Sequence, residues 1–108
     1  MVNSERTALS EAVFYILLSL YTPMHGYGIM QNIRQISNDR VNLGAGTLYG
    51  AINTLLEKKW IQPVEEDNDS RRKEYVITTL GKSIARNEMT RLEELLLNGK
   101  KIEGGEHG

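Results

Sequence analysis

The chain lacks cysteine and has few prolines and large aromatic residues, with two prolines, one tryptophan and one phenylalanine in 108 residues. The absence of cysteine excludes a disulfide framework, a thiol nucleophile, an iron–sulfur cluster and a cysteine zinc site. Long apolar runs are missing too. The longest, residues 12–20, is too short to span a membrane and follows charged residues without a small-residue cleavage site. We therefore expect a cytoplasmic protein without a membrane segment or signal peptide.

Motifs of catalysis and metal binding are also missing. The two histidines, His25 and His107, are far apart in the sequence, and neither belongs to a His-Glu-x-x-His motif. There is no phosphate-binding loop and no nucleophile elbow. The segment 67–69 begins like a calcium loop, but Arg71 occupies the fifth position and no glycine stands sixth. We expect a protein that is not an enzyme and has no catalytic residues, metal site or cofactor.

Basic and acidic residues nearly balance, since the net charge is -1, but they are unevenly distributed along the chain. Residues 65–70 contain four acids, whereas residues 71–91 contain six basic residues and two acids. The local potential, and not the total charge, attracts phosphate. A near-neutral chain of this kind can present one positive face to nucleic acid.

Three helices are predicted before residue 60. The first covers about residues 4–21 and has two apolar stripes, one formed by Leu9, Ala12, Val13, Ile16, Leu17 and Leu20 and the other by Phe14, Leu18 and Tyr21. We expect the second stripe to contact another subunit, and the alternative is that both stripes lie in one core. The second helix, 26–37, has an inward stripe of Tyr27, Ile29, Met30, Ile33 and Ile36. The third, about 44–59, turns Leu48, Ile52, Leu55 and Leu56 inward.

The period then changes from helical to extended. Residues 61–66 and 73–78 are predicted as two strands of a hairpin around the polar turn 67–70. Thr78 or Thr79 caps a last helix in which Ala85, Met89, Leu92 and Leu96 are spaced by four, three and four, and Leu95 and Leu97 widen the seam. We predict a mainly α fold with a small β-hairpin (α+β), a winged helix-turn-helix over residues 1–78. A dimerisation helix at 79–102 and a disordered glycine-rich tail at 103–108 follow.

The outer face of the third helix is the first candidate DNA contact. It carries Gly46, Thr47, Tyr49, Gly50 and Asn53. Glycine costs about 1 kcal/mol in a helix relative to alanine, but it lets the helix approach a phosphate or a groove wall closely. Asn can bond adenine, Thr can contact phosphate or a thymine methyl, and the Tyr49 ring can lie half in the core with its hydroxyl facing a phosphate. The alternative is that these glycines serve as a cap or pack against a neighbour.

The wing is the second candidate. Arg71, Arg72 and Lys73 are consecutive, and because an extended chain alternates its side chains they cannot all face one surface. At least one of them can reach a phosphate or a minor groove. The acids at 65–69 offer another partner for these cations across the hairpin.

The candidate dimer interface joins the first and last helices through Leu9, Val13, Met89, Leu92, Leu95 and Leu96. An inducer site would have to lie where these helices of two subunits meet. The residues there are all apolar, so a plain hydrophobic seam is the alternative.

Four motifs, in the same order along the chain, resemble those of a known family. Residues 25–29 resemble the start of the second helix, residues 46–49 with 55–61 resemble the recognition helix and the strand that follows it, and Ser70 to Thr78 with Gly81 resemble the wing of PadR-like transcriptional regulators. The resemblance covers about Leu9 to Leu97 and implies a homodimeric repressor that binds operator DNA and is released by a small-molecule effector or stress signal. The twofold symmetry of such a dimer predicts a pseudopalindromic operator in double-stranded DNA. It adds Tyr27 to the candidate DNA contacts.

Trp60 departs from the family pattern, in which glycine commonly ends the recognition helix with a positive φ. We expect the Trp60 ring to pack over Lys58, Ile61 or the hairpin. The rival function is a winged helix that holds a protein partner in place of DNA.

Overall fold

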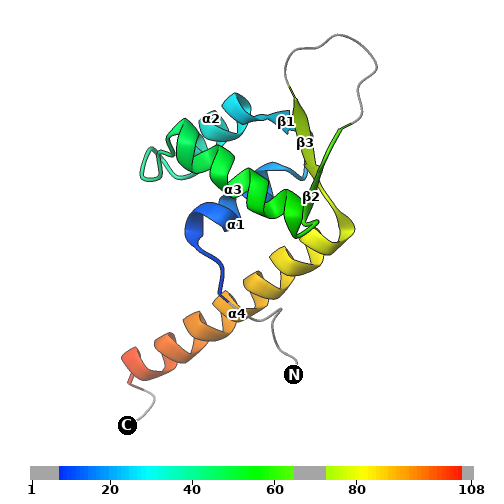
Figure 1. Cartoon of the computed structure of the whole chain (residues 1–108). Helices are drawn as coiled ribbons and strands as arrows, with labels where there is room; N and C mark the ends of the chain where they lie inside the picture. Colours follow the sequence, from blue (N-terminus) through cyan, green and yellow to red (C-terminus); the bar gives the residue numbers. More distant parts are fainter. Residues whose placement is uncertain (1–7, 65–72, 106–108) are drawn as a thin grey trace.

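The computed structural model describes residues 8–64 and 73–105. Within these ranges the chain folds into four helices and a three-stranded sheet (Figure 1). The elements are α1 (Glu11–Ser19), β1 (Met24–His25), α2 (Gly26–Ile36), α3 (Ala45–Glu57), β2 (Ile61–Pro63), β3 (Glu74–Ile77) and α4 (Thr79–Glu103). The predicted winged helix-turn-helix followed by a long terminal helix is confirmed.

The first helix begins later than predicted. The Ser10 side chain accepts a hydrogen bond from the Val13 N–H (3.1 Å) and caps α1 at Glu11, as a short hydroxyl side chain does at a helix N-terminus. Residues 8–10 are therefore not helical, and the expected start near Ser4 lies outside the described residues. At the other end α1 is tied to α2 because Asn32 donates to the Ser19 hydroxyl (2.9 Å).

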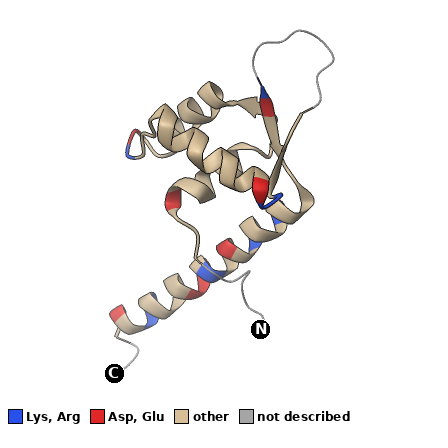
Figure 2. Cartoon of the chain, viewed as in Figure 1, with Lys and Arg blue, Asp and Glu red and all other residues tan. Residues whose placement is uncertain are grey.

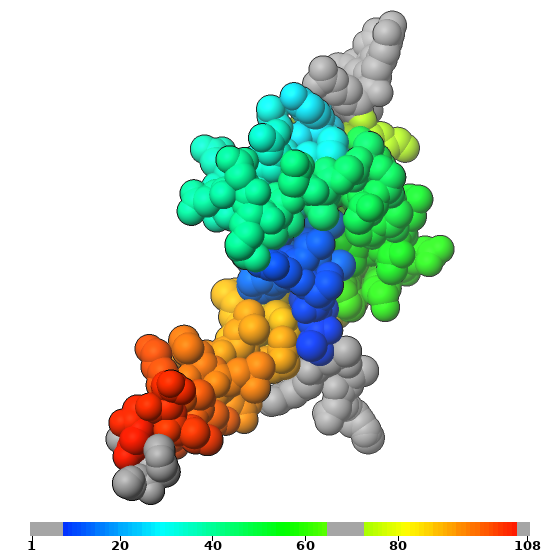
Figure 3. All heavy atoms as spheres, turned by 90° about the vertical axis from the view of Figure 1, so that its left-hand side faces the viewer, coloured from blue at the N-terminus to red at the C-terminus, as the bar shows by residue number. Residues whose placement is uncertain are grey.

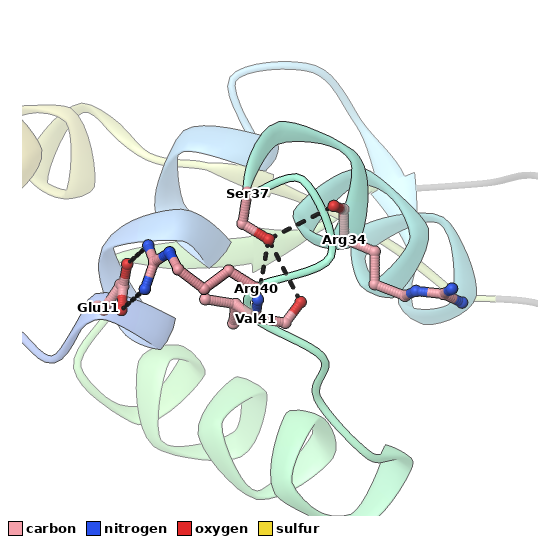
Figure 4. A network of polar contacts seen from close by, with 5 residues as sticks. All are labelled: Glu11, Arg34, Ser37, Arg40 and Val41. Carbon is pink, nitrogen blue, oxygen red and sulfur yellow. Dashed lines mark hydrogen bonds and ion pairs between the residues drawn. The ribbon is translucent and has the colours of Figure 1, made fainter.

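The turn between α2 and α3 is held by side chains from three segments (Figure 4). Ser37, which is buried, accepts a hydrogen bond from the Val41 N–H (3.0 Å). Arg40 makes a bidentate ion pair with Glu11 of α1. Asn38 and Asp39 both have positive φ, 55° and 64°, a conformation that Asn and Asp tolerate better than most residues. These contacts set the position of α3 relative to α1 and α2.

The sheet contains one strand more than the predicted hairpin. β3 lies in the middle and pairs antiparallel with both β1 and β2. The sequence analysis treated Met24 and His25 as part of the break between two helices, but they pair with Tyr75 and Glu74. Within the described residues, β2 covers Ile61–Pro63 and β3 covers Glu74–Ile77, and the Val64 N–H still donates to the Glu74 carbonyl (2.9 Å). Residues 65 and 66 of the first predicted strand lie outside the described residues.

The core lies between α1, α2, α3, the first turns of α4 and the sheet. It contains Ile16, Leu17, Leu20, Ile29, Ile33, Leu48, Ile52, Leu55, Ile61, Tyr75, Ile77 and Ile84. The predicted inward stripe of α2 is wrong at its two ends, because Tyr27 and Ile36 are 61% and 46% exposed. They lie at the margins of a short helix whose buried face needs only Ile29 and Ile33 to reach the core.

α3 ends in a Schellman motif whose left-handed residue is Lys59 and not Trp60. Lys59 has a φ of 63°, its N–H bonds to the Leu56 carbonyl (3.1 Å), and the Trp60 N–H bonds to the Leu55 carbonyl (3.0 Å). The preceding lysine therefore adopts the conformation that glycine usually provides. Trp60 packs against the core with the Lys58 ammonium 5.1 Å from its ring centre, as the expected packing over Lys58 requires.

Candidate nucleic-acid interface

The outer face of α3 is open to solvent over its whole length. Because Leu48, Ile52 and Leu55 are buried on the core side, the opposite side carries a strip formed by Gly46, Gly50 and Asn53, which we call the glycine strip. A period of 3.6 residues places these three positions on one line along the helix. The strip, Thr47 beside it and Tyr49 are all exposed, as the sequence analysis expected.

The glycines of this strip have no structural partner. A Cβ atom built on Gly46 or Gly50 would meet nothing within 4 Å, and the same is true of Gly44. Packing against a neighbouring part of the described chain therefore does not account for them. Glycine in a helix destabilises it by about 0.5–1 kcal/mol relative to alanine. The glycine strip leaves the backbone of α3 accessible to a closely approaching surface, at the end of the helix where free amides favour an anion.

Tyr49 lies at the edge of the strip and reaches back toward α2. A Cβ atom on Gly26, the first residue of α2, would lie 2.0 Å from the Tyr49 hydroxyl oxygen. Tyr49 is 43% exposed, and its hydroxyl lies against Gly26 at the start of α2. The expectation that this hydroxyl faces a phosphate stays a prediction. Tyr75 is buried nearby, and this burial, with a smaller contribution from Tyr49, raises the pKa of Tyr75.

Tyr27 projects from the first turn of α2 into solvent, where its hydroxyl accepts a hydrogen bond from the Gln31 side chain (3.2 Å). The starts of α2 and α3 thus each carry an exposed tyrosine, Tyr27 and Tyr49. Tyrosine presents a wide apolar ring and a hydroxyl that can bond a phosphate oxygen. The two helices together form an uncharged surface that is rich in groups suited to a DNA backbone.

In the cartoon, most of α2 and α3 is free of charged positions (Figure 2). The only charged residues within α2 and α3 are Arg34 and Glu57. Of the basic wing cluster, Lys73 is exposed next to β3, whereas Arg71 and Arg72 lie outside the described residues. The described residues of α2 and α3 therefore carry few cations, and two of the three basic residues that the sequence analysis assigned to the wing lie outside the described residues.

The second half of α4 extends away from the rest of the molecule (Figures 1 and 3). Its exposed apolar residues are Met89, Leu92, Leu95, Leu96, Leu97 and Ile102. The heptad-like spacing identified most of these positions but not Ile102, which falls outside that repeat. Leu9 and Val13 are half-buried and pack against the core.

A cavity of about 810 Å³ lies between the start of α1, the end of α3 and the start of α4. Its lining is mostly apolar and includes Leu9, Val13, Leu55, Trp60, Leu80 and Ile84. Lys58 is the ionisable residue in the lining. The sequence analysis placed an inducer site around Leu9, Val13, Leu92 and Leu96. The first two line this cavity and the last two do not.

Two kinds of site do not occur in the described ranges. No helix there is long and apolar enough to cross a bilayer. The same ranges contain no group of three or more His, Cys, Asp or Glu side chains arranged to hold a metal ion.

Comparison with known proteins gives a consistent result. Residues 13–87 match the transcriptional regulator PadR-like family. A solved transcriptional regulator from Clostridium thermocellum, Cth-833, superimposes with a TM-score of 0.65 at 25% identity, covering 88% of this chain and 91% of that one. A PadR family transcriptional regulator from Eggerthella lenta DSM 2243 gives 0.70 at 23% identity, with 86% and 81% covered.

One sequence relative is an uncharacterized 37.1 kDa protein in transposon TN4556 of Streptomyces fradiae. It is 38% identical over 66 residues, which amount to 61% of this chain and 18% of that protein. The aligned part thus spans less than a fifth of that relative.

Proposed function

This chain belongs to the PadR-like family of transcriptional regulators, and from that premise we propose that it is a homodimeric repressor of a pseudopalindromic operator in double-stranded DNA. α3 enters the major groove with the glycine strip toward the DNA. Gly46 and Gly50 allow close approach, Thr47, Tyr49 and Tyr27 contact the backbone, and Asn53 reads a base edge. Arg71, Arg72 and Lys73 contact phosphates from the wing.

The single observation that carries this proposal is the open glycine strip on α3. Two glycines that no neighbour in the described chain requires lower helix stability. Close approach to an external surface explains both of them. The major groove of B-DNA is wide enough to admit an α-helix, and a helix without side chains on its leading face reaches further into it.

The apolar half of α4 supports the second part of the proposal, the dimer. Met89, Leu92, Leu95 and Leu96 form one exposed stripe that continues the buried face of the same helix. Burial of a leucine side chain contributes on the order of 1.5–3 kcal/mol, so pairing two such stripes offers a substantial gain. A twofold dimer uses the same patch on both subunits and places two α3 helices on adjacent half-sites about one DNA turn apart.

Selection of random DNA fragments by the purified protein tests this function. We expect an enriched inverted repeat, bound more weakly at higher salt, and a dimer in sedimentation measurements. Recovery of fragments without a repeated motif contradicts the operator proposal. A monomer at micromolar concentration contradicts the dimer. If the protein binds no DNA at any salt concentration, the rival function as a protein-interaction winged helix gains support.

The proposal includes an effector whose binding releases the protein from the operator. It requires no cofactor and no catalysis, and it places the protein in the cytoplasm. The cavity beside Trp60 is suited to it because its lining joins the end of α3 to the start of α4. Trp60 is the only tryptophan, so its fluorescence reports on this space. Titration with the apolar dye anilinonaphthalene sulfonate should quench Trp60 and weaken operator binding, and unchanged emission contradicts this site.

A further inference from the structure

One face of α4 is buried in the first turns of the helix and exposed in the last ones. Its buried residues are Gly81, Ile84, Ala85 and Glu88. With 3.6 residues per turn, the same face continues with Leu92, Leu95, Leu96, Gly99 and Ile102, which we call the outer α4 face. All residues of the outer α4 face are exposed, and this half of the helix extends away from the rest of the molecule (Figures 1 and 3).

Gly99 leaves a hollow in the outer α4 face. This surface hollow has a volume of about 510 Å³ and is lined by Leu95, Leu96, Gly99, Lys100, Glu103 and Gly104. A Cβ atom built on Gly99 would meet nothing within 4 Å, so no part of the described chain requires a glycine here. Glycine in a helix interior destabilises the helix relative to alanine. Entry of a side chain from another molecule into the hollow accounts for its presence.

Leu92 is a side chain of the same face that fits such a hollow. It is 40% exposed and lies seven residues, or about 10.5 Å, before Gly99 along α4. In a twofold dimer every contact occurs twice, with the two residues exchanged between the subunits. Two antiparallel α4 helices can therefore place each Leu92 in the Gly99 hollow of the other subunit. The twofold axis of this arrangement passes between Leu95 and Leu96.

Charged residues beside the outer α4 face lead to nearly the same alignment. Glu93 and Lys100 are exposed, are also seven residues apart, and flank the face on one side. Opposite charges at flanking positions determine how paired helices are oriented. In an antiparallel pair, each Glu93 lies opposite the partner subunit's Lys100 when the axis passes between Leu96 and Leu97. The two alignments differ by one residue, or about 1.5 Å, so one dimer satisfies both.

The position of the DNA-binding domain also favours antiparallel helices. Residues 81–88 of the pairing face are already covered by the chain's own domain, with α1 among the contacts. Parallel helices paired through this face would bring both domains into the space between them at one end. Antiparallel helices carry the domains to opposite ends, because the partner's α4 ends at about the level of Met89. A parallel pair would also leave the two Gly99 hollows facing each other.

We propose that the dimer forms by an antiparallel crossing of the two α4 helices, in which Leu92 of each subunit fills the Gly99 hollow of the other and Leu96 contacts the partner subunit's Leu96 beside the twofold axis. This inference rests on the proposed function, from which it takes the dimer, and adds the direction and register of the pairing. At 1.5 Å per residue, the two Gly81 residues lie about 45 Å apart along the helices. This keeps the two DNA-binding domains apart, as two separate half-sites require.

Single-cysteine variants test the direction and the register, because the chain has no cysteine. A disulfide requires two Cα atoms within about 7 Å of each other. Leu96→Cys should cross-link the dimer on mild oxidation. Leu92→Cys should not, since an antiparallel pair separates the two copies of residue 92 by about 11 Å along the helix. Leu92→Cys and Gly99→Cys proteins, mixed until they exchange subunits, should form a mixed disulfide.

The opposite cross-linking results overturn the proposal. Efficient cross-linking of Leu92→Cys by itself indicates parallel helices. Absence of a cross-link in Leu96→Cys indicates that the subunits meet through another surface.

Exchange of the large and the small residue tests the contact itself. Gly99→Leu should raise the dissociation constant of the dimer by about tenfold or more, although leucine favours a helix over glycine. The double variant Leu92→Ala with Gly99→Leu should dimerise nearly as tightly as the wild type, a rescue that a change in helix stability alone does not produce. Thr90→Leu adds a leucine on the opposite side of α4 and should dimerise as the wild type does. A double variant that dimerises no better than Gly99→Leu overturns the contact.

Sedimentation of the wild-type protein distinguishes this inference from the proposed function. A monomer at micromolar concentration overturns the dimer and this inference with it. A dimer that binds the selected operator but gives no cross-link in Leu96→Cys retains the proposed function and overturns only the antiparallel crossing of α4.

Discussion

Replacement of Gly50 by alanine should make the protein more stable and a weaker DNA binder. Gly50 lies inside α3, and a Cβ atom there would meet nothing within 4 Å. Alanine in a helix interior is favoured over glycine by about 0.5–1 kcal/mol. For a domain of this size, 1 kcal/mol corresponds to a change of about 4–8 °C in melting temperature. We therefore expect an increase of about 2–8 °C.

The effect on DNA binding should have the opposite sign. The new methyl group projects from the glycine strip between Gly46 and Asn53, on the surface that we place in the groove. A loss of about 1.4 kcal/mol is a tenfold weaker affinity, and we expect about this loss from Gly50→Ala. Gly50→Leu, whose side chain extends further, should weaken binding by more than about a hundredfold, or about 2.7 kcal/mol.

Thermal unfolding and fluorescence anisotropy with the selected operator measure the two effects on the same samples. Thr90→Ala is a matched control, since it also raises helix propensity at an exposed position, on the side of α4 away from the leucine stripe. It should stabilise without weakening DNA binding. A Gly50→Ala protein that melts earlier would show that the strip is packed in the assembled protein. Unchanged affinity would show that α3 does not approach DNA with this face.

Three further outcomes are expected. Lys59→Gly should stabilise the fold by about 0.5–1 kcal/mol in urea unfolding. A left-handed non-glycine residue costs about 1–2 kcal/mol, and the greater freedom of the unfolded glycine chain offsets part of this gain. Lys58→Gly, at the C-cap with a φ of -79°, should destabilise the fold, and equal effects at both positions would refute the assignment of Lys59. If the dimer makes about eight phosphate contacts, the logarithm of the affinity should fall against the logarithm of the salt concentration with a slope near -7. The double variant Arg71→Ala with Arg72→Ala should weaken binding to all sequences alike and make this slope shallower by about 0.9 per lost contact. An unchanged slope would show that the wing does not contact phosphate. Hydrogen bonds from Arg91 hold the pKa of Glu88 below its ordinary value against the opposing effect of burial. The ionised Glu88 therefore stabilises the fold at a pH above its pKa in the unfolded chain, and this stability is lost as the pH falls through its pKa in the folded protein. Glu88→Gln should lose less stability than wild type between pH 5 and about pH 3, and identical pH profiles would contradict the ion pair.

Local patterns predicted most of the helices because their causes are local. The spacing of Leu48, Ile52 and Leu55 identified the buried side of α3 and, by subtraction, the exposed side with its glycines. Thr78 identified the start of α4, since a hydroxyl before an apolar repeat is the usual signal for a cap. In each case the residues that determine the structure lie within a few positions of one another.

The misses have in common that they depend on distant segments. β1 exists because Tyr75 and Glu74 arrive beside Met24 and His25, and two residues carry no recognisable strand pattern. Tyr27 and Ile36 fit an inward stripe by spacing, yet α2 contacts the core along a narrower face. Glu88 was not identified from the sequence, because only the fold shows that this residue is 4% exposed and paired with Arg91.

By itself, the sequence determined the order of the helices, the buried side of each main helix, the apolar stripe of α4 and the family to which the motifs pointed. The tertiary structure alone decided that no other part of the described chain packs on the glycine strip, that Lys59 in place of Trp60 is the left-handed residue at the end of α3, and that Glu88 is buried on α4. The physical reason is the distance along the chain over which each effect acts. Helix periodicity and capping arise within one or two turns of the chain, whereas the exposure of a glycine or the burial of a carboxylate is set by residues many tens of positions away, which only folding brings into contact.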